Sequence, residues 1–143
     1  MRITFTIILL LIAGQITAQG YQSPSRELVE SYLDQINSCK DFLNELEADI
    51  ADMEKNAQQV TLAQYNEAKA LHSRAKTCLA ATRAKLDELR KDYPGWFNNP
   101  GAVLNLSKGN HVTPKGLNKG LEAVTAKIRK LLDRLEAIEK PSH

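Results

Sequence analysis

Residues 25–60 read SRELVESYLDQINSCKDFLNELEADIADMEKNAQQV, and their apolar positions decide the fold class. One apolar set recurs every seven residues, and a second set follows it at an offset of three. This alternation is the seam of an amphipathic helix, sustained for more than four heptads as in a coiled coil. Leu33 and Phe42 widen the stripe, which favours a bundle formed within one chain. The first set is Val29, Ile36, Leu43, Ile50 and Ala57, and the second is Tyr32, Cys39, Leu46, Met53 and Val60.

Capping residues delimit the first two helices. Ser23-Pro24 offers an N-cap followed by proline at the first helical position, so the first helix is expected over 24–58. Thr61 and Gln64 have the spacing of a capping box that would start a second helix over 61–92. Tyr93-Pro94-Gly95 ends it. Because the turn is short, the two helices should form an antiparallel hairpin.

A third helix is expected over 113–139. Thr113 is its candidate N-cap, Pro114 its first residue, and Lys140-Pro141 ends it. Its apolar residues alternate at spacings of four and three, so it too has one apolar face. Three such faces must be buried against one another. The sequence therefore predicts an all-α, elongated three-helix bundle over 23–140, a long antiparallel hairpin with the third helix laid along it.

Charge is distributed unevenly, although the whole chain carries only +2. Residues 21–60 hold three basic and nine acidic side chains, whereas residues 61–93 hold seven basic and four acidic ones, and residues 94–143 eight and four. On the third helix, Lys119, Lys127, Lys130 and Arg134 share one flank of the apolar stripe. We expect this flank to lie beside the acidic first helix and to select the packing arrangement, since each such pair contributes only about 0.2–1 kcal/mol.

Cys39 and Cys78 are the two cysteines. They are equidistant from the predicted turn, so they should lie at the same height on facing helices, each on an apolar stripe. An intrachain disulfide is the leading interpretation. Two free buried thiols and an intermolecular disulfide are the alternatives.

The first residues resemble a secretory signal in all three of its parts. Met1-Arg2 is a positive start, Ile3 to Ala13 is a short apolar run, and the small residue Ala18 follows. The apolar run is shorter than the roughly 20 residues that a membrane span needs. The pattern predicts a cleaved signal peptide over 1–18, with 1–20 as the alternative, and a secreted, extracellular protein, or a periplasmic one in a bacterium.

The segment 93–112 has no helical periodicity and is expected to be a long loop. A loop of this length in a compact domain is either functional or disordered. It contains Trp96 and Phe97, which could be an exposed partner contact or a lid over one end of the bundle. Asn105-Leu106-Ser107 is an acceptor sequence for N-glycosylation in a eukaryote.

No pattern of residues in the sequence indicates catalysis, a metal site or a cofactor. His72, His111 and His143 are scattered, and His72 is expected to be half-exposed beside the seam. The leading hypothesis is a secreted, non-enzymatic protein that binds another protein or a cell-surface component, not nucleic acid and not a membrane. The alternatives are a carrier of a small apolar ligand or lipid inside the bundle, and a membrane-surface-active protein using the basic third helix.

Overall fold

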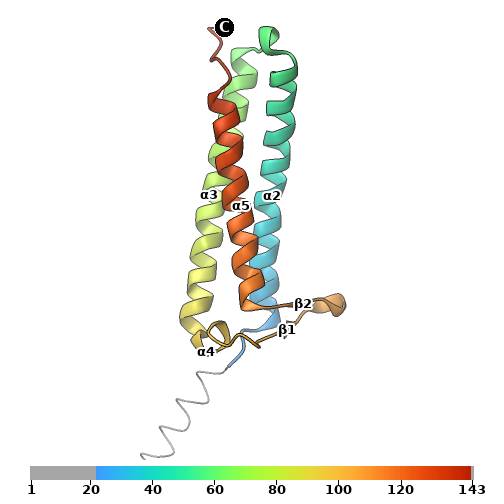
Figure 1. Ribbon diagram of the computed structural model, residues 1–143, viewed down its shortest axis with the longest axis vertical. Coiled ribbons are helices and arrows are strands. Elements are labelled where there is room, and N and C mark those ends of the chain that lie inside the picture. The colour runs from blue at the N-terminus through green and yellow to red at the C-terminus, as the bar shows by residue number, and fades with distance from the viewer. Residues whose placement is uncertain (1–21, 143) are drawn as a thin grey trace, which may run out of the picture.

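Three long helices dominate the protein. A computed structural model describes residues 22–142, with α2 over Arg26–Lys55, α3 over Leu62–Asp92 and α5 over Pro114–Glu136. Figure 1 shows these helices side by side along one axis, with the α2–α3 turn at one end and the 93–112 segment at the other. Each of the three packs against the other two. The predicted all-α bundle with one disulfide is confirmed.

The start of α2 differs from the prediction by two residues. Ser25, not Ser23, is the N-cap, and its hydroxyl oxygen accepts a hydrogen bond from the Leu28 backbone N–H at 3.2 Å. Pro24 precedes the cap and is buried rather than opening the helix. Both serines have the chemistry of an N-cap, so residue type alone does not distinguish them.

The starts of α3 and α5 form the predicted caps, whereas α2 and α5 each end three residues earlier than predicted. The capping box at Thr61 and Gln64 is present, with hydrogen bonds of 3.0 and 3.1 Å. Thr113 caps α5 by accepting from the Gly116 N–H at 3.0 Å. At its C-terminal end, α2 stops at Lys55 and is followed by a 3₁₀ turn over Ala57–Gln59, just before the Thr61 cap of α3. At the other end of the chain α5 stops at Glu136, because the Ile138 N–H bonds to the Leu135 carbonyl in a tighter turn.

The core is built from the predicted seams. All eight α2 seam positions from Val29 to Met53 are buried, whereas Ala57 is exposed because the helix has already ended. His72 is buried as well, at 9% exposure, so its expected half-exposed position is wrong. The α3 and α5 core residues are Tyr65, Ala68, Leu71, Ala75, Leu79, Thr82, Leu86, Leu89, Leu117, Val124, Ile128, Leu131 and Leu135.

The 93–112 segment contains more structure than the sequence predicted. A one-turn helix, α4, covers Pro94–Phe97, and two short strands follow, β1 over Leu104–Asn105 and β2 over His111–Val112. The strands pair antiparallel with Leu104 opposite Val112, and the 3₁₀ turn Ser107–Gly109 joins them. Strands of two residues are too short to show an alternating pattern. The hairpin points away from the bundle in Figure 1.

Within residues 22–142, no helix is both long enough and apolar enough to span a bilayer. The predicted signal peptide, in either the 1–18 or the 1–20 form, lies wholly outside the described residues.

Candidate functional site

The disulfide joins the middle of the helical hairpin. Cys39 of α2 and Cys78 of α3 are bonded, with their Cα atoms 5.6 Å apart. The Thr82 hydroxyl lies 3.4 Å from the Cys39 sulfur and donates a hydrogen bond to the Cys78 carbonyl at 2.8 Å. Thr82 is therefore a buried polar residue whose hydrogen bonding is satisfied one turn back along its own helix. The intrachain bond is confirmed, and neither cysteine retains a thiol.

Trp96 packs into the core at the loop end of the bundle. It is 4% exposed, and its ring contacts the half-buried Phe97 edge to face, with centroids 5.0 Å apart. This geometry corresponds to the lid alternative for Trp96, and it leaves only part of Phe97 available to a partner. The indole Nε1 is buried without a hydrogen-bond partner among the described residues.

The β1–β2 hairpin is tied to the first turns of α2. The Ser107 N–H donates to the Glu30 carboxylate at 2.9 Å, and the Arg26 guanidinium donates to the Asn105 carbonyl at 3.3 Å. The hydrogen bonds from Ser107 hold the pKa of Glu30 below its ordinary value. Lys108 and Gly109 adopt positive φ angles of 64° and 73°, which turns the chain sharply at the tip. The two contacts therefore hold the turn end of the hairpin beside α2, while Lys108 and Gly109 within the turn are exposed to solvent.

Asn105 lies on this hairpin with an exposed side chain. Its backbone carbonyl bonds to Arg26, while its side-chain amide makes no hydrogen bond among the described residues. Attachment of a glycan there would not require unfolding of the hairpin. Glycosylation at Asn105 remains a prediction.

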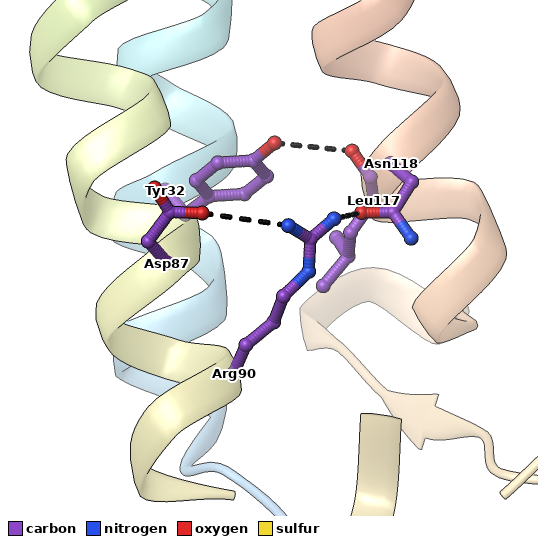
Figure 2. Close-up of polar contacts among 5 residues, drawn as sticks. All are labelled: Tyr32, Asp87, Arg90, Leu117 and Asn118. Carbon is purple, nitrogen blue, oxygen red and sulfur yellow. Dashed lines mark hydrogen bonds and ion pairs between the residues drawn. The ribbon is translucent and has the colours of Figure 1, made fainter. Parts of the chain in front are cut away.

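A polar cluster links the three long helices near this end (Figure 2). The Tyr32 hydroxyl of α2 donates to the Leu117 carbonyl of α5 at 3.0 Å, and Tyr32 is fully buried. Burial raises the pKa of Tyr32 to about 12, although the nearby Arg90 guanidinium opposes the shift. Arg90 of α3 donates to the side chains of Asp87 and Asn118. These contacts orient the start of α5 against the hairpin of α2 and α3.

Complementary charges pair between α2 and α5. Lys127 pairs with Glu47 at 2.9 Å and donates to Asn44, and Arg134 pairs with Glu54. Lys127 and Arg134 belong to the basic flank that the sequence analysis placed beside the acidic first helix, so that arrangement is observed for these two residues. Hydrogen bonds from the two cations hold the pKa values of Glu47 and Glu54 below their ordinary value.

The sequence analysis missed a second basic surface, on α3. Lys69, Lys76, Arg83 and Arg90 recur every seven residues and therefore share one face of the helix. The signal in the sequence is the heptad spacing of these charged residues. The structure places three of these four residues on the rim of the groove between α3 and α5.

Within the part of the chain that the structure describes, no three histidine, cysteine or carboxylate side chains gather as a metal-binding group. Burial, then the nearby Lys76 and Lys69, lower the pKa of His72, and Glu136 opposes this shift.

The fold and these surfaces define a disulfide-linked three-helix bundle with a projecting hairpin at one end. Comparison of the chain with known protein families, characterised proteins and solved structures gives no match.

Proposed function

We propose that the protein is an exported, non-enzymatic binding protein that holds another protein or a cell-surface component at the loop end of its bundle. One observation carries the proposal. The 104–112 hairpin projects from the end of the bundle at which Leu28 and Val103 are exposed, and these are the large apolar side chains with high exposure among the described residues, at 43% and 51%.

A rigid scaffold that presents a short non-helical segment is a common arrangement for recognition. Here the hairpin is held by Glu30 and Arg26, so little chain entropy would be lost when a partner binds. Because Trp96 is buried, the apolar contacts would come from Val103, Leu28 and the exposed part of Phe97. Export is supported by the signal-like start of the sequence and by a disulfide, which persists in oxidising compartments.

The two alternative functions have less support. A carrier would need space inside the bundle, but the central positions are filled by fully buried side chains such as Tyr32, Leu43 and Leu86. The hollows described below lie in grooves on the outside. Membrane-surface activity of α5 would require its apolar face, which packs in the core through Val124, Ile128 and Leu131.

Affinity capture with the mature chain tests the proposal. Residues 19–143 would be immobilised and exposed to extracellular fluid and cell-surface extract from the source organism. The Leu28→Asp/Val103→Asp variant should lose a partner that the wild type captures. The matched control is Ala57→Asp/Ala63→Asp, which places the same charges on exposed positions at the opposite end. Equal capture by all three proteins would contradict a binding surface at the loop end.

A further inference from the structure

The groove between α3 and α5 differs in charge from the groove between α2 and α5. Two adjoining hollows of about 350 and 360 Å³ lie along it, and Arg83, Thr125 and Arg129 line both. Lys76 and Arg90 line one hollow each, so four cations border the groove against one carboxylate, that of Glu122. Arg83 and Arg129 come from opposite helices. The α3 side of the groove is therefore basic, and α5 adds Arg129 and Glu122, whereas the contact between α2 and α5 pairs acidic residues with basic ones.

These cations are largely uncompensated within the protein. Among residues 22–142, Arg90 contacts Asp87 and Asn118, while Lys76, Arg83 and Arg129 form no ion pair. Like charges on facing helices repel one another, and the repulsion would be relieved by an anionic group lying between them. Within residues 22–142, Glu122 is the one carboxylate that lines this groove.

The floor of the groove is apolar. Leu79 and Ile128 are buried beneath it, and Leu121 and Leu132 are half-buried along its length. His72 lines the same floor, and its Nε2 is buried with no hydrogen-bond partner among the described residues. An occupant should therefore combine an apolar stripe with negative charges on either side of it. A sulfated polysaccharide supplies the charges but not the apolar stripe.

The length of the groove also indicates its occupant. From His72 to Arg90 along α3 the distance is about 27 Å at 1.5 Å per residue, which is five turns of helix. The cations of α3 recur every seven residues, a spacing that acidic residues on a neighbouring helix can match. The chain already contains one such pairing, since α2 presents Glu47 and Glu54, seven residues apart, to Lys127 and Arg134 of α5.

We propose that the α3–α5 groove binds an acidic amphipathic helix of another protein, which packs there as a fourth helix of the bundle. Its apolar stripe contacts Leu121, Ile128 and Leu132, and its carboxylates pair with Arg83 and Arg129 from the two sides. This mode of recognition is a helix laid into a groove. The groove lies on the side of the bundle and does not include the hairpin, so the inference does not depend on the function proposed above.

A pair of synthetic peptides tests the assignment. Each is a fluorescein-labelled helix of about 21 residues, three heptads, with leucine at the two apolar positions. One carries glutamate and the other lysine at the flanking positions. Fluorescence anisotropy with the mature wild-type protein should show binding of the acidic peptide and not of the basic one. No binding of the acidic peptide at 100 μM protein, or equal binding of both, would overturn the proposal.

Charge reversal locates the binding. Arg83→Glu/Arg129→Glu should weaken binding of the acidic peptide at least tenfold and create binding of the lysine peptide. Arg74→Glu/Lys40→Glu, with the same change in net charge at exposed positions outside the groove, should behave as the wild type does. Equal weakening by both variants would show a general charge effect and overturn the site. The far-ultraviolet circular dichroism of each variant verifies that it is folded.

Two further measurements separate other occupants. Binding of heparin that is lost with Arg83→Glu/Arg129→Glu, without binding of the acidic peptide, would assign the cations to a polysaccharide and overturn the proposal. Self-association of the mature protein in sedimentation equilibrium, lost in the same variant, would assign the groove to α2 of a second copy. That result would overturn the assignment to a different protein.

Discussion

At the scale of single residues, Tyr32 both fills the core and helps to orient α5 against α2. Its ring is fully buried and its hydroxyl meets the Leu117 carbonyl in the first turn of α5. A carbonyl near the start of a helix can be bonded within that helix, yet it has a second lone pair that Tyr32 engages. Removing the hydroxyl should therefore loosen the docking of α5 without emptying the core.

We expect Tyr32→Phe to reduce the free energy of unfolding by about 1–2 kcal/mol at pH 7, since one buried hydrogen bond is lost. The measurement is the urea midpoint followed by circular dichroism. Tyr93→Phe, a half-buried tyrosine at the same end, is the matched control. A loss no larger than that of the control would mean that the Leu117 contact contributes nothing.

The raised pKa of Tyr32 adds a pH dependence. Its pKa is about 12 in the fold against 10.0 ordinarily, so burial favours the neutral phenol. The stability linked to this group is fully present below pH 10 and is lost as the pH rises toward 12. Between pH 9 and pH 11.5 the wild type should lose stability more steeply than Tyr32→Phe does. Parallel curves for the two proteins would contradict a buried, neutral Tyr32.

Individual residues show where sequence reasoning stops. The heptad seam predicts that Tyr32 is buried, but the identity of its acceptor depends on how α5 docks. The sequence does not predict the exposure of Trp96 for a similar reason, since a loop without periodicity does not reveal which side chains turn inward. His72 was misplaced because it lies at the edge of its stripe, where the third helix decides between burial and exposure.

At the scale of elements, Gly120 sets the approach of α5 to α2. A Cβ added at Gly120 would lie 3.3 Å from Ile36 Cδ1, closer than ordinary contact. Glycine inside a helix costs about 1 kcal/mol relative to alanine. We expect Gly120→Ala to be close to neutral, because the gain in helix propensity is offset by contact with Ile36.

If Ile36 is shortened, the gain in helix propensity from Gly120→Ala should appear as increased stability. In an Ile36→Val background, which lacks Cδ1, Gly120→Ala should stabilise the protein by about 0.5–1 kcal/mol in urea unfolding. The coupling is the difference between the two backgrounds in a double-mutant cycle. Ile50→Val, a buried α2 residue nearer the other end of the bundle, is the control background and should give no coupling. A coupling of equal size there would refute the contact.

The disulfide stabilises the hairpin of α2 and α3 chiefly by restricting the unfolded chain. Its two cysteines are separated by 39 residues, which corresponds to about 4 kcal/mol in the chain-entropy model. Cys39→Ala/Cys78→Ala should therefore lower the free energy of unfolding by up to about 4 kcal/mol while the helix content of the folded protein is retained. Loss of helix content before any denaturant is added would instead show that the bundle cannot form without the bond.

Long elements could be predicted from the sequence and short ones could not. Thr61 with Gln64 and Thr113 with Pro114 mark helix starts through local chemistry that needs no tertiary information. The β1–β2 hairpin has two residues per strand, and it is positioned by Glu30 and Arg26 of a helix more than seventy residues away in the chain. Such a contact leaves no local pattern, although Gly109 between apolar stretches is a weak turn signal.

At the scale of the whole molecule, the net charge of each helical segment explains why the α2–α5 contact and the α3–α5 groove differ in charge. The acidic α2 segment meets basic residues of α5, and ion pairs form between them. Both the α3 and the α5 segments carry a net positive charge, and among the described residues four cations and one carboxylate line the groove between them. The sequence shows the uneven distribution of charge. It does not show which helices lie next to each other, and this comes from the structure.

The α2–α5 ion pairs predict how the bundle responds to acid. The pKa values of Glu47 and Glu54 lie below their ordinary 4.5 in the fold, so these carboxylates contribute stability above that pH and lose it as the pH falls through their lowered values. Urea midpoints from pH 6 to pH 2.5 should fall less steeply for Glu47→Gln/Glu54→Gln than for the wild type. The control is Asp41→Asn/Glu45→Gln, two exposed α2 carboxylates that form no ion pair within the described residues. Because the side chains of Glu47 and Glu54 are accessible to solvent, 0.5 M NaCl should reduce the difference in acid sensitivity between the wild type and Glu47→Gln/Glu54→Gln. A difference that salt leaves unchanged would show that charge pairing between α2 and α5 is not its source.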